Sequence, residues 1–387
     1  MADLHIEGTC DARFARVKDA FAENFSKRNE YGAAVAVTIA GQPVLNLWAG
    51  HADKARTRPW TRDTLVNVFS TTKGLTAICA HRLADQGKLD FDAPVARYWP
   101  EFAQNGKERI PVRQLLNHRA GLPAIRHQLP DDAAYDWSTM TTALAAEEPW
   151  WEPGSKHGYH ALTYGWLVGE VIRRVTGKSV GTYFRDELAA PLALDCHIGL
   201  DSRDDDRCGQ MIQSPPPPPG QMNIFQYAMD HPASVTARTF NNPPTALKLS
   251  AVNARAWRGA EIPAANGHTT ARALSRLYGA LATGGEVGGV RVLSPAEITR
   301  CHTEESAGPD EVLMVPTRFS TGFMLTQPHD PIGPNPHAFG HPGAGGSLGF
   351  ADPDAKIGFG YTMNKMGPYI LIDPRTRCLI EALYASL

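Results

Sequence analysis

The distribution of apolar and polar residues predicts β-strands at both ends of the chain and helices in its middle. Two runs rich in β-forming residues, 32–40 and 43–50, are separated by Gly41-Gln42, which is typical of a hairpin. Near the C-terminus, residues 346–364 alternate glycines and β-formers around a turn, which predicts a second hairpin.

Helices are predicted from apolar residues that recur every three or four positions. The first such segment places Phe14, Val17 and Phe21 on one face. Glycine, which commonly follows the end of a helix, closes two further segments at Gly87 and Gly177. The sequence therefore predicts helices at 8–28, from Ser70 to near Gly87, over most of 110–186, at 267–285 and at 373–387.

Terminal strands and a helical middle favour an α+β fold in which both chain ends share one antiparallel sheet flanked by helices. We expect residues 1–85 and 175–387 to form this domain, and residues 86–174 to form an inserted, mostly helical domain. A ligand cleft would lie between them. Residues 201–222 include five consecutive prolines, which cannot continue a helix or a central strand, and are predicted to form an exposed long loop.

Composition narrows the classes of function. Of the 387 residues, 43% are apolar and 20% charged, and the formal net charge is −2, so nothing indicates nucleic-acid binding. The start has no apolar signal-peptide core, and no run of about 18 apolar residues occurs, so we expect a cytoplasmic protein without a membrane span. The scattered cysteines indicate reduced thiols. The sequence predicts neither a metal nor another cofactor and indicates no oligomeric state.

The candidate chemistry begins with Ser70 and Lys73, which stand three positions apart at the start of an apolar helix. Residues at this spacing share one helix face, so the lysine can reach the serine hydroxyl. A serine is a poor nucleophile unless a base takes its proton, and a buried lysine with a lowered pKa can be that base. The structural alternative is a helix N-terminus at which Ser70 or a following threonine caps the backbone while Lys73 extends to water.

Two further motifs follow along the chain. Tyr159 stands in a glycine-containing turn before a predicted helix, and His341-Pro342-Gly343 opens a glycine-rich β-segment. Together with Ser70-Thr71-Thr72-Lys73, they make the chain resemble the serine β-lactamase and DD-peptidase superfamily, closest to its class C-like esterase branch, the family VIII carboxylesterases. The resemblance covers nearly the whole chain and implies a β-lactamase/transpeptidase-like fold.

The resemblance also implies a role for each catalytic residue. Ser70 would attack an acyl carbonyl and form an acyl-enzyme, while Lys73 and Tyr159 share the proton transfers. We expect the lysine cation to lower the tyrosine pKa, by roughly three units if ~4 Å separate the groups at an effective dielectric of about 20. The backbone N–H groups of Ser70 and Ala344 would hold the oxyanion.

The third motif departs from the superfamily pattern in a way that concerns the substrate. His341 stands where β-lactamases carry a lysine, and a histidine is mostly neutral at pH 7, so it offers no permanent cation to a substrate carboxylate. We therefore expect His341 and Gly343 to bind an uncharged small molecule, a short-chain carboxylic ester. Residues 204–206, all aspartates, would disfavour anions further if they face the site.

Other functions fit the same residues. A β-lactamase, D-amino-acid peptidase or small-amide hydrolase would use the same motifs, an acyltransferase would form the same acyl-enzyme, and a scaffold would need none of them. Ser347 lies in a Gly-x-Ser-x-Gly sequence, which matches the nucleophile elbow of α/β-hydrolases. That motif needs a histidine later in the chain, and none follows Ser347, so we expect this serine to be structural.

Overall fold

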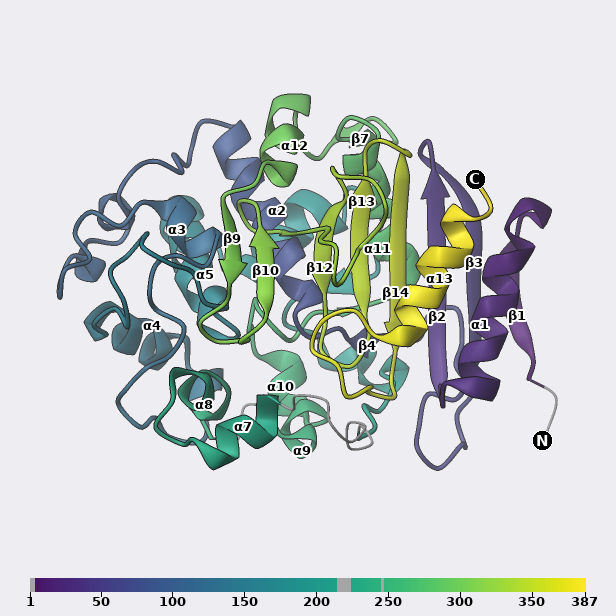
Figure 1. The fold of residues 1–387 in the computed structure, drawn as a ribbon, viewed down its shortest axis with the longest axis horizontal. Helices are drawn as coiled ribbons and strands as arrows, with labels where there is room; N and C mark the ends of the chain where they lie inside the picture. The colour runs from purple at the N-terminus through teal and green to yellow at the C-terminus, as the bar shows by residue number, and fades with distance from the viewer. Residues whose placement is uncertain (1–3, 214–223, 245–246) are drawn as a thin grey trace.

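The structure, a computed structural model, describes residues 4–213, 224–244 and 247–387. Within these ranges, a nine-stranded antiparallel sheet combines strands from both ends of the chain (Figure 1). In spatial order its strands are β1 (Ile6–Cys10), β3 (Gln42–Gly50), β2 (Gly32–Ile39), β14 (Ile357–Met363), β13 (Leu348–Asp352), β12 (Phe339–Pro342), β11 (Met324–Leu325), β10 (Pro316–Phe319) and β9 (Ser306–Pro309).

Both predicted hairpins lie at the centre of this sheet. The turn between β2 and β3 is formed by Ala40 and Gly41, whose φ angles of 48° and 78° are those of the tight turns that match strand twist. The C-terminal hairpin of β13 and β14 joins the N-terminal one because β14 pairs with β2 from Ile357–Ile39 to Met363–Ala33. The α+β fold with a shared antiparallel sheet is thus confirmed.

The first predicted helix is partly wrong. Residues 6–10 form the edge strand β1, which pairs with β3, and the helix α1 (Ala15–Lys27) begins only afterwards. The Asp11 side chain accepts a hydrogen bond from the Arg13 N–H and so starts a short 3₁₀ turn between β1 and α1. Helical periodicity is satisfied by the phenylalanines of α1, but it does not show where pairing with another strand takes over.

Residues 110–186, which were predicted to be mostly helical, contain short helices joined by long loops. The helices are α3 (Val112–Leu116), α4 (Trp137–Ala146), α5 (Thr163–Thr176) and α6 (Val180–Phe184). Helix α4 begins later than expected because the Asp136 side chain accepts hydrogen bonds from Ser138 and Thr139 N–H groups. Helix α5 ends, as predicted, at Gly177 with φ 71°. The proposed domain division at 86–174 stays a prediction.

The predicted long loop is only partly loop. Residues 202–207 form a 3₁₀ helix, and Cys208 and Ile212 make isolated bridges to Leu65 and Lys365. The proline run lies outside the described residues. All six cysteines are free, as the sequence indicated. Among described helices, none has the length and apolar character needed to cross a bilayer.

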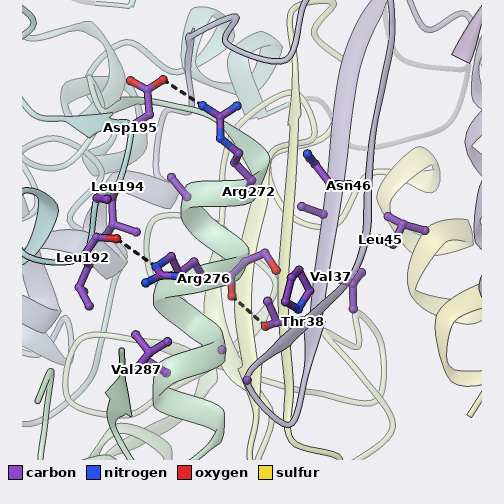
Figure 2. A pocket seen from close by; sticks show the side chains of 18 of the residues that line it. Val37, Thr38, Leu45, Asn46, Leu192, Leu194, Asp195, Arg272, Arg276 and Val287 are labelled. Carbon is purple, nitrogen blue, oxygen red and sulfur yellow. Dashed lines mark hydrogen bonds and ion pairs between the residues drawn. The ribbon is translucent and has the colours of Figure 1, made fainter. Parts of the chain in front are cut away.

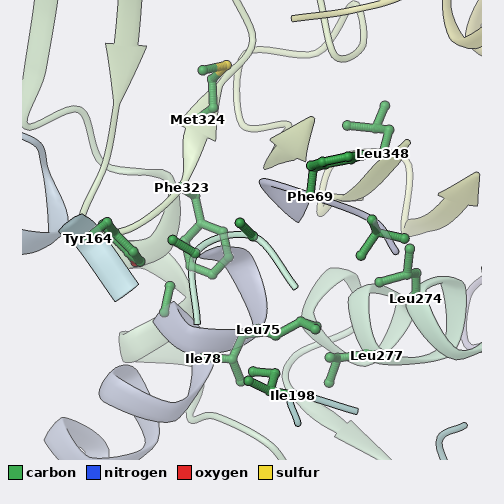
Figure 3. Close-up of a cluster of buried hydrophobic side chains, with 14 of the residues drawn as sticks. Phe69, Leu75, Ile78, Tyr164, Ile198, Leu274, Leu277, Phe323, Met324 and Leu348 are labelled. Atoms are coloured by element: carbon green, nitrogen blue, oxygen red, sulfur yellow. The ribbon is translucent and has the colours of Figure 1, made fainter. Parts of the chain in front are cut away.

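The sheet lies between two helical layers. Helices α1 and α13 (Pro374–Tyr384) pack side by side over the strands formed by the chain ends (Figure 1). Helices α2 (Thr71–Asp85) and α11 (Ala271–Ala282) pack on the other face. Apolar side chains from both helices meet there, including Leu75, Ile78 and Leu277 (Figure 3). Helix α2 is therefore buried on nearly all sides, as its apolar sequence predicted.

Glycines let helix α11 approach the sheet closely. A Cβ at position 358 in β14 would lie 2.2 Å from the backbone nitrogen of Gly279 in α11, and a Cβ at position 360 would lie 2.2 Å from the carbonyl oxygen of Ala271. These neighbours are backbone atoms, which cannot move aside as a side-chain tip can. The distance between helix α11 and the sheet therefore depends on glycine at positions 358 and 360.

We expect Gly358→Ala to lower the free energy of unfolding by about 3 kcal/mol, the upper part of the usual cost of overpacking, because helix and sheet must separate. Denaturant unfolding measures this change. Gly106→Ala is the matched control: Gly106 has a positive φ of 79° but no atom within 4 Å of an added Cβ, so it should cost only about 1 kcal/mol. Equal losses in the two variants would contradict the packing argument.

Candidate active site

Ser70 immediately precedes helix α2 but does not cap it. Its side chain makes no capping hydrogen bond, and its own φ and ψ of −66° and −12° are already helical. The preceding residue, Phe69, has a φ of +43°, an unfavourable conformation for a bulky residue that recurs at functional sites. The capping alternative considered for the sequence is therefore wrong, and the Ser70 hydroxyl is available for chemistry.

Lys73 is fully buried and does not reach water. Its Nζ lies 3.2 Å from Ser70 Oγ, 2.7 Å from the carbonyl oxygen of Ala161 and 3.0 Å from that of Ala264. Among the described residues, no carboxylate forms an ion pair with it, and burial alone holds the Lys73 pKa well below its ordinary value. An isolated buried ammonium is costly, so burial favours the neutral amine.

The three contacts suit a neutral amine. An amine nitrogen carries two hydrogens and one lone pair in a tetrahedral arrangement. If its hydrogens are donated to the two carbonyl oxygens, the lone pair points to the third neighbour, Ser70 Oγ, whose O–H can then donate to it. The two backbone acceptors, the carbonyls of Ala161 and Ala264, could not be found from side-chain motifs.

Tyr159 lies next to Lys73, and the lysine Nζ is 4.7 Å from the centre of the tyrosine ring. Its loop is fixed by Asp310, whose Oδ1 accepts hydrogen bonds from the N–H groups of Tyr159, Val312 and Leu313 at 2.8 to 3.0 Å. Asp310 is buried and far from Tyr159 in sequence, and no motif pointed to it. It is therefore a positioning residue that only the tertiary structure reveals.

The expected direction of the Tyr159 pKa is reversed. Burial raises the pKa of the phenol, and its hydrogen bond with Ser70 only partly opposes this shift. The expectation assumed a charged lysine beside the tyrosine, but burial also lowers the Lys73 pKa and so disfavours the cation that would stabilise a tyrosinate. Tyr159 is thus a phenol that can donate its proton, and Lys73 is the better base.

His341, in strand β12, reaches this cluster and is buried. Its ring centre lies 6.0 Å from that of Tyr159. Its Nδ1 is 2.8 Å from the carbonyl oxygen of Pro342 and donates to it, which fixes the neutral tautomer. Burial lowers the His341 pKa to about 3. The residue is therefore neutral at physiological pH, as its replacement of a lysine suggested.

Two backbone amides are free to bind an oxyanion. In the described structure, the N–H groups of Ser70 and Ala344 donate to no protein acceptor, and both residues line the same cavity. The loop that carries Ala344 is held from behind by helix α13. Arg375 donates to the Gly345 carbonyl and Thr376 Oγ1 to the Gly346 carbonyl, both at 2.6 Å.

Gly343 does not line the cavity, so the structure gives no support to its predicted contact with substrate. A Cβ at this position would lie 2.2 Å from both the Val68 carbonyl oxygen and Ser347 Oγ. A glycine is required at this position for a different reason: the turn between β12 and β13 packs directly against the backbone just before Ser70. Ser347 Oγ donates to the Val68 carbonyl at 2.8 Å and contacts Thr71 Oγ1 at 3.2 Å, which fits the structural role expected for this serine.

The cavity at Ser70 is small and uncharged. It has a volume of about 80 Å³, and none of the described residues that line it is Lys, Arg, Asp or Glu. Beyond the reactive groups, its lining is apolar: Leu162, Phe240, Leu247, Met324, Met366, Ile370 and Leu371. The aspartates proposed to repel anions do not line it. Asp204 pairs with Arg207 at 2.8 Å and Asp205 with Arg255 at 2.7 Å, so their charges are compensated.

A larger cavity of about 480 Å³ lies between α11, the β2–β3 hairpin and residues 192–195 (Figure 2). Its hydroxyl groups serve the fold: Thr38 Oγ1 donates to the Ser275 carbonyl, and Ser275 Oγ donates to the Gly358 carbonyl. Arg276 donates to the Leu192 carbonyl, as Figure 2 shows. The hydroxyls of Thr38 and Ser275 are thus engaged by the fold, whereas Ser70 and Tyr159 line the smaller cavity.

Comparisons with known proteins agree with this geometry. Residues 17–377 match the family model described as Beta-lactamase. The chain is 41% identical over 377 residues to Esterase/beta-lactamase LipL of Mycobacterium tuberculosis, which covers 96% of this chain and 86% of LipL. A solved family VIII carboxylesterase is 43% identical, with a TM-score of 0.91 over 99% of this chain and 100% of its own. A penicillin-binding protein homolog from Caulobacter crescentus is 42% identical, with the same TM-score and coverage.

Fold and relatives together define a hydrolase of the β-lactamase fold. The chain belongs to the beta-lactamase family, and the resemblance to family VIII carboxylesterases that its motifs indicated is confirmed. In the described part of the chain, no three His, Cys, Asp or Glu side chains are placed to hold a metal ion.

The lowered Lys73 pKa predicts how the reactivity of Ser70 depends on pH. A base acts in its unprotonated form, so labelling by a fluorophosphonate should rise with pH and level off well below the ordinary lysine pKa of 10.5. Mass spectrometry should place the label on Ser70, and Ser347→Ala should still be labelled. A midpoint at or above the ordinary value would rule out a neutral lysine base.

Proposed function

We propose that this protein is a serine carboxylesterase that cleaves short-chain esters through an acyl-enzyme on Ser70. The observation that carries the proposal is that Lys73 is buried without an ion-pair partner, with its Nζ 3.2 Å from Ser70 Oγ. Ser70 in turn lines a cavity that has no charged residue in its described lining. The names of similar proteins, an esterase/beta-lactamase and a family VIII carboxylesterase, support the same class of reaction.

In acylation, Lys73 takes the Ser70 proton as Oγ forms a bond to the ester carbonyl carbon. The carbonyl oxygen becomes an oxyanion, which the N–H groups of Ser70 and Ala344 stabilise. The bond to the alcohol oxygen then breaks, and Tyr159, a neutral phenol beside Ser70, donates a proton to the departing alkoxide. The proton held by Lys73 restores the phenol, so the amine is neutral again when the acyl-enzyme has formed.

The cavity favours small uncharged substrates. Its volume of about 80 Å³ and its apolar lining suit a short acyl chain, whose burial contributes about 0.8 kcal/mol per CH₂. A substrate carboxylate would lose its hydration without gaining a cation, because no basic residue of the described chain lines the cavity and His341 is neutral. The aspartates at 204–206 do not line the cavity and play no part in this preference.

β-Lactam hydrolysis is the second candidate. The relative LipL is named as both an esterase and a beta-lactamase, and a β-lactam carbonyl requires the same nucleophile and oxyanion donors. The missing cation would weaken binding of the β-lactam carboxylate without preventing acylation. We therefore propose weak β-lactam turnover beside the ester activity.

A substrate panel tests the proposal. For p-nitrophenyl acetate or butyrate, kcat/KM should exceed that for a chromogenic cephalosporin by at least ~10-fold, since about 1.4 kcal/mol of lost charge stabilisation is a factor of ten. Ser70→Ala should lower kcat on the esters by at least ~10³, because it removes the nucleophile of a unit whose parts act together. Faster cephalosporin hydrolysis would favour the β-lactamase function instead, and an active Ser70→Ala variant would exclude the mechanism.

The role of Tyr159 can be tested through the leaving group. A nitrophenolate leaves without being protonated, whereas an alkoxide needs a proton. Tyr159→Phe should therefore lower kcat/KM for a simple alkyl butyrate by at least ~10-fold more than for p-nitrophenyl butyrate. The two rates are compared by titration of released acid and by absorbance. If both substrates lose activity equally, Tyr159 is not the proton donor.

A further inference from the structure

One polar atom in the candidate site has no use within the protein. His341 Nε2 is buried and has no hydrogen-bond partner among the described residues, although Nδ1 is satisfied by the Pro342 carbonyl. Other buried histidines nearby differ: His160 has both ring nitrogens engaged, with the Gly158 carbonyl and the Leu122 N–H. Unpartnered buried polar groups are rare in folded proteins and call for an explanation.

The tautomer determines what Nε2 can do. Because Nδ1 carries the ring hydrogen, Nε2 presents a lone pair and can only accept a hydrogen bond. His341 lines the same cavity as Ser70 and Tyr159, with its ring 6.0 Å from the tyrosine ring. The cavity therefore presents a donor, the Tyr159 phenol, and an acceptor, His341 Nε2, to a small oxygen-containing group.

The two halves of an esterase reaction use this pair differently. In acylation, the oxygen that leaves the carbonyl carbon is an alkoxide without hydrogen, so it needs the Tyr159 donor and gains nothing from a lone pair. In deacylation, water enters where the alcohol left, as microscopic reversibility requires. Water carries two O–H groups, and it needs acceptors that orient it toward the acyl carbon. An acceptor such as His341 Nε2 therefore has no role in acylation but can orient the water in deacylation.

We propose that His341 Nε2 and Tyr159 form an acyl-acceptor subsite that holds the hydrolytic water of deacylation. This inference rests on the proposed esterase function and assigns His341 to its second step. One water O–H donates to Nε2 and stays intact. The other proton passes to Tyr159, whose own proton passes to Lys73, as the water oxygen bonds to the acyl carbon. The bond between that carbon and Ser70 Oγ then breaks, Oγ takes the proton from Lys73, and the carboxylic acid leaves.

The experiment separates the two steps in one assay. In stopped-flow reactions with p-nitrophenyl butyrate, the burst of nitrophenolate reports acylation, and the steady-state rate reports deacylation when the acyl-enzyme accumulates. His341→Phe keeps a ring but has no acceptor. It should keep the burst rate within ~3-fold, lower the steady-state rate by at least ~10-fold, and accumulate butyryl-Ser70 detectable by mass spectrometry.

His341→Gln is the matched variant because its amide oxygen can replace Nε2 as an acceptor. It should recover at least ~3-fold of the lost steady-state rate and shorten the life of the acyl-enzyme, a result that a purely structural role would not give. Thermal unfolding of both variants checks that they are folded. If His341→Phe does not fold, the comparison of His341→Gln with His341→Asn, whose shorter amide cannot reach the Nε2 position, decides the question.

Two results would overturn the proposal. One is a burst and a steady-state rate that fall together in His341→Phe, or in His341→Asn if that variant replaces it, without accumulation of acyl-enzyme. The other is a steady-state rate that does not change. In either case a wild-type enzyme that forms butyryl-Ser70 would leave the esterase function standing. A wild type that forms no acyl-enzyme and hydrolyses no ester would instead remove the proposed function and this subsite with it.

Discussion

The candidate site depends on one constraint, a lysine amine that is buried without a counter-charge. Lys73 has no exposed surface, and no carboxylate in the described structure pairs with it. The cost of burying an unpaired cation lowers the Lys73 pKa and favours the neutral amine. Two carbonyl oxygens take its hydrogens, and its lone pair is left for Ser70. A carboxylate at this place would stabilise the ammonium and remove the base, so the apolar surroundings of helix α2 are part of the chemistry.

The same burial sets the character of the whole pocket. It raises the pKa of Tyr159 and lowers that of His341, so the phenol keeps its proton and the imidazole takes none. The three groups become a base, a donor and an acceptor without any net charge. A neutral cavity favours neutral substrates, which links the pKa of the reactive groups to the choice of an ester over a carboxylate-bearing β-lactam.

Segments distant in the sequence must be held together for this arrangement to form. Asp310 fixes the loop of Tyr159 by three backbone hydrogen bonds. Arg375, buried between Glu30 and Asp373, fixes the loop of Ala344 from the C-terminal helix. Neither Asp310 nor Arg375 lines the cavity at Ser70, and both hold backbone groups in place.

The sequence by itself determined the fold class, the order of the terminal hairpins and the motifs of Ser70, Tyr159 and His341, because periodicity, turn residues and side-chain spacing are local. It could not determine the state of those groups. The direction of the Tyr159 pKa depends on burial, and the two acceptors of the Lys73 hydrogens are backbone carbonyls, which every residue possesses. The free Nε2 of His341 likewise results from which atoms surround it. Such properties arise only when the sheet brings distant segments together, so only the tertiary structure decided them.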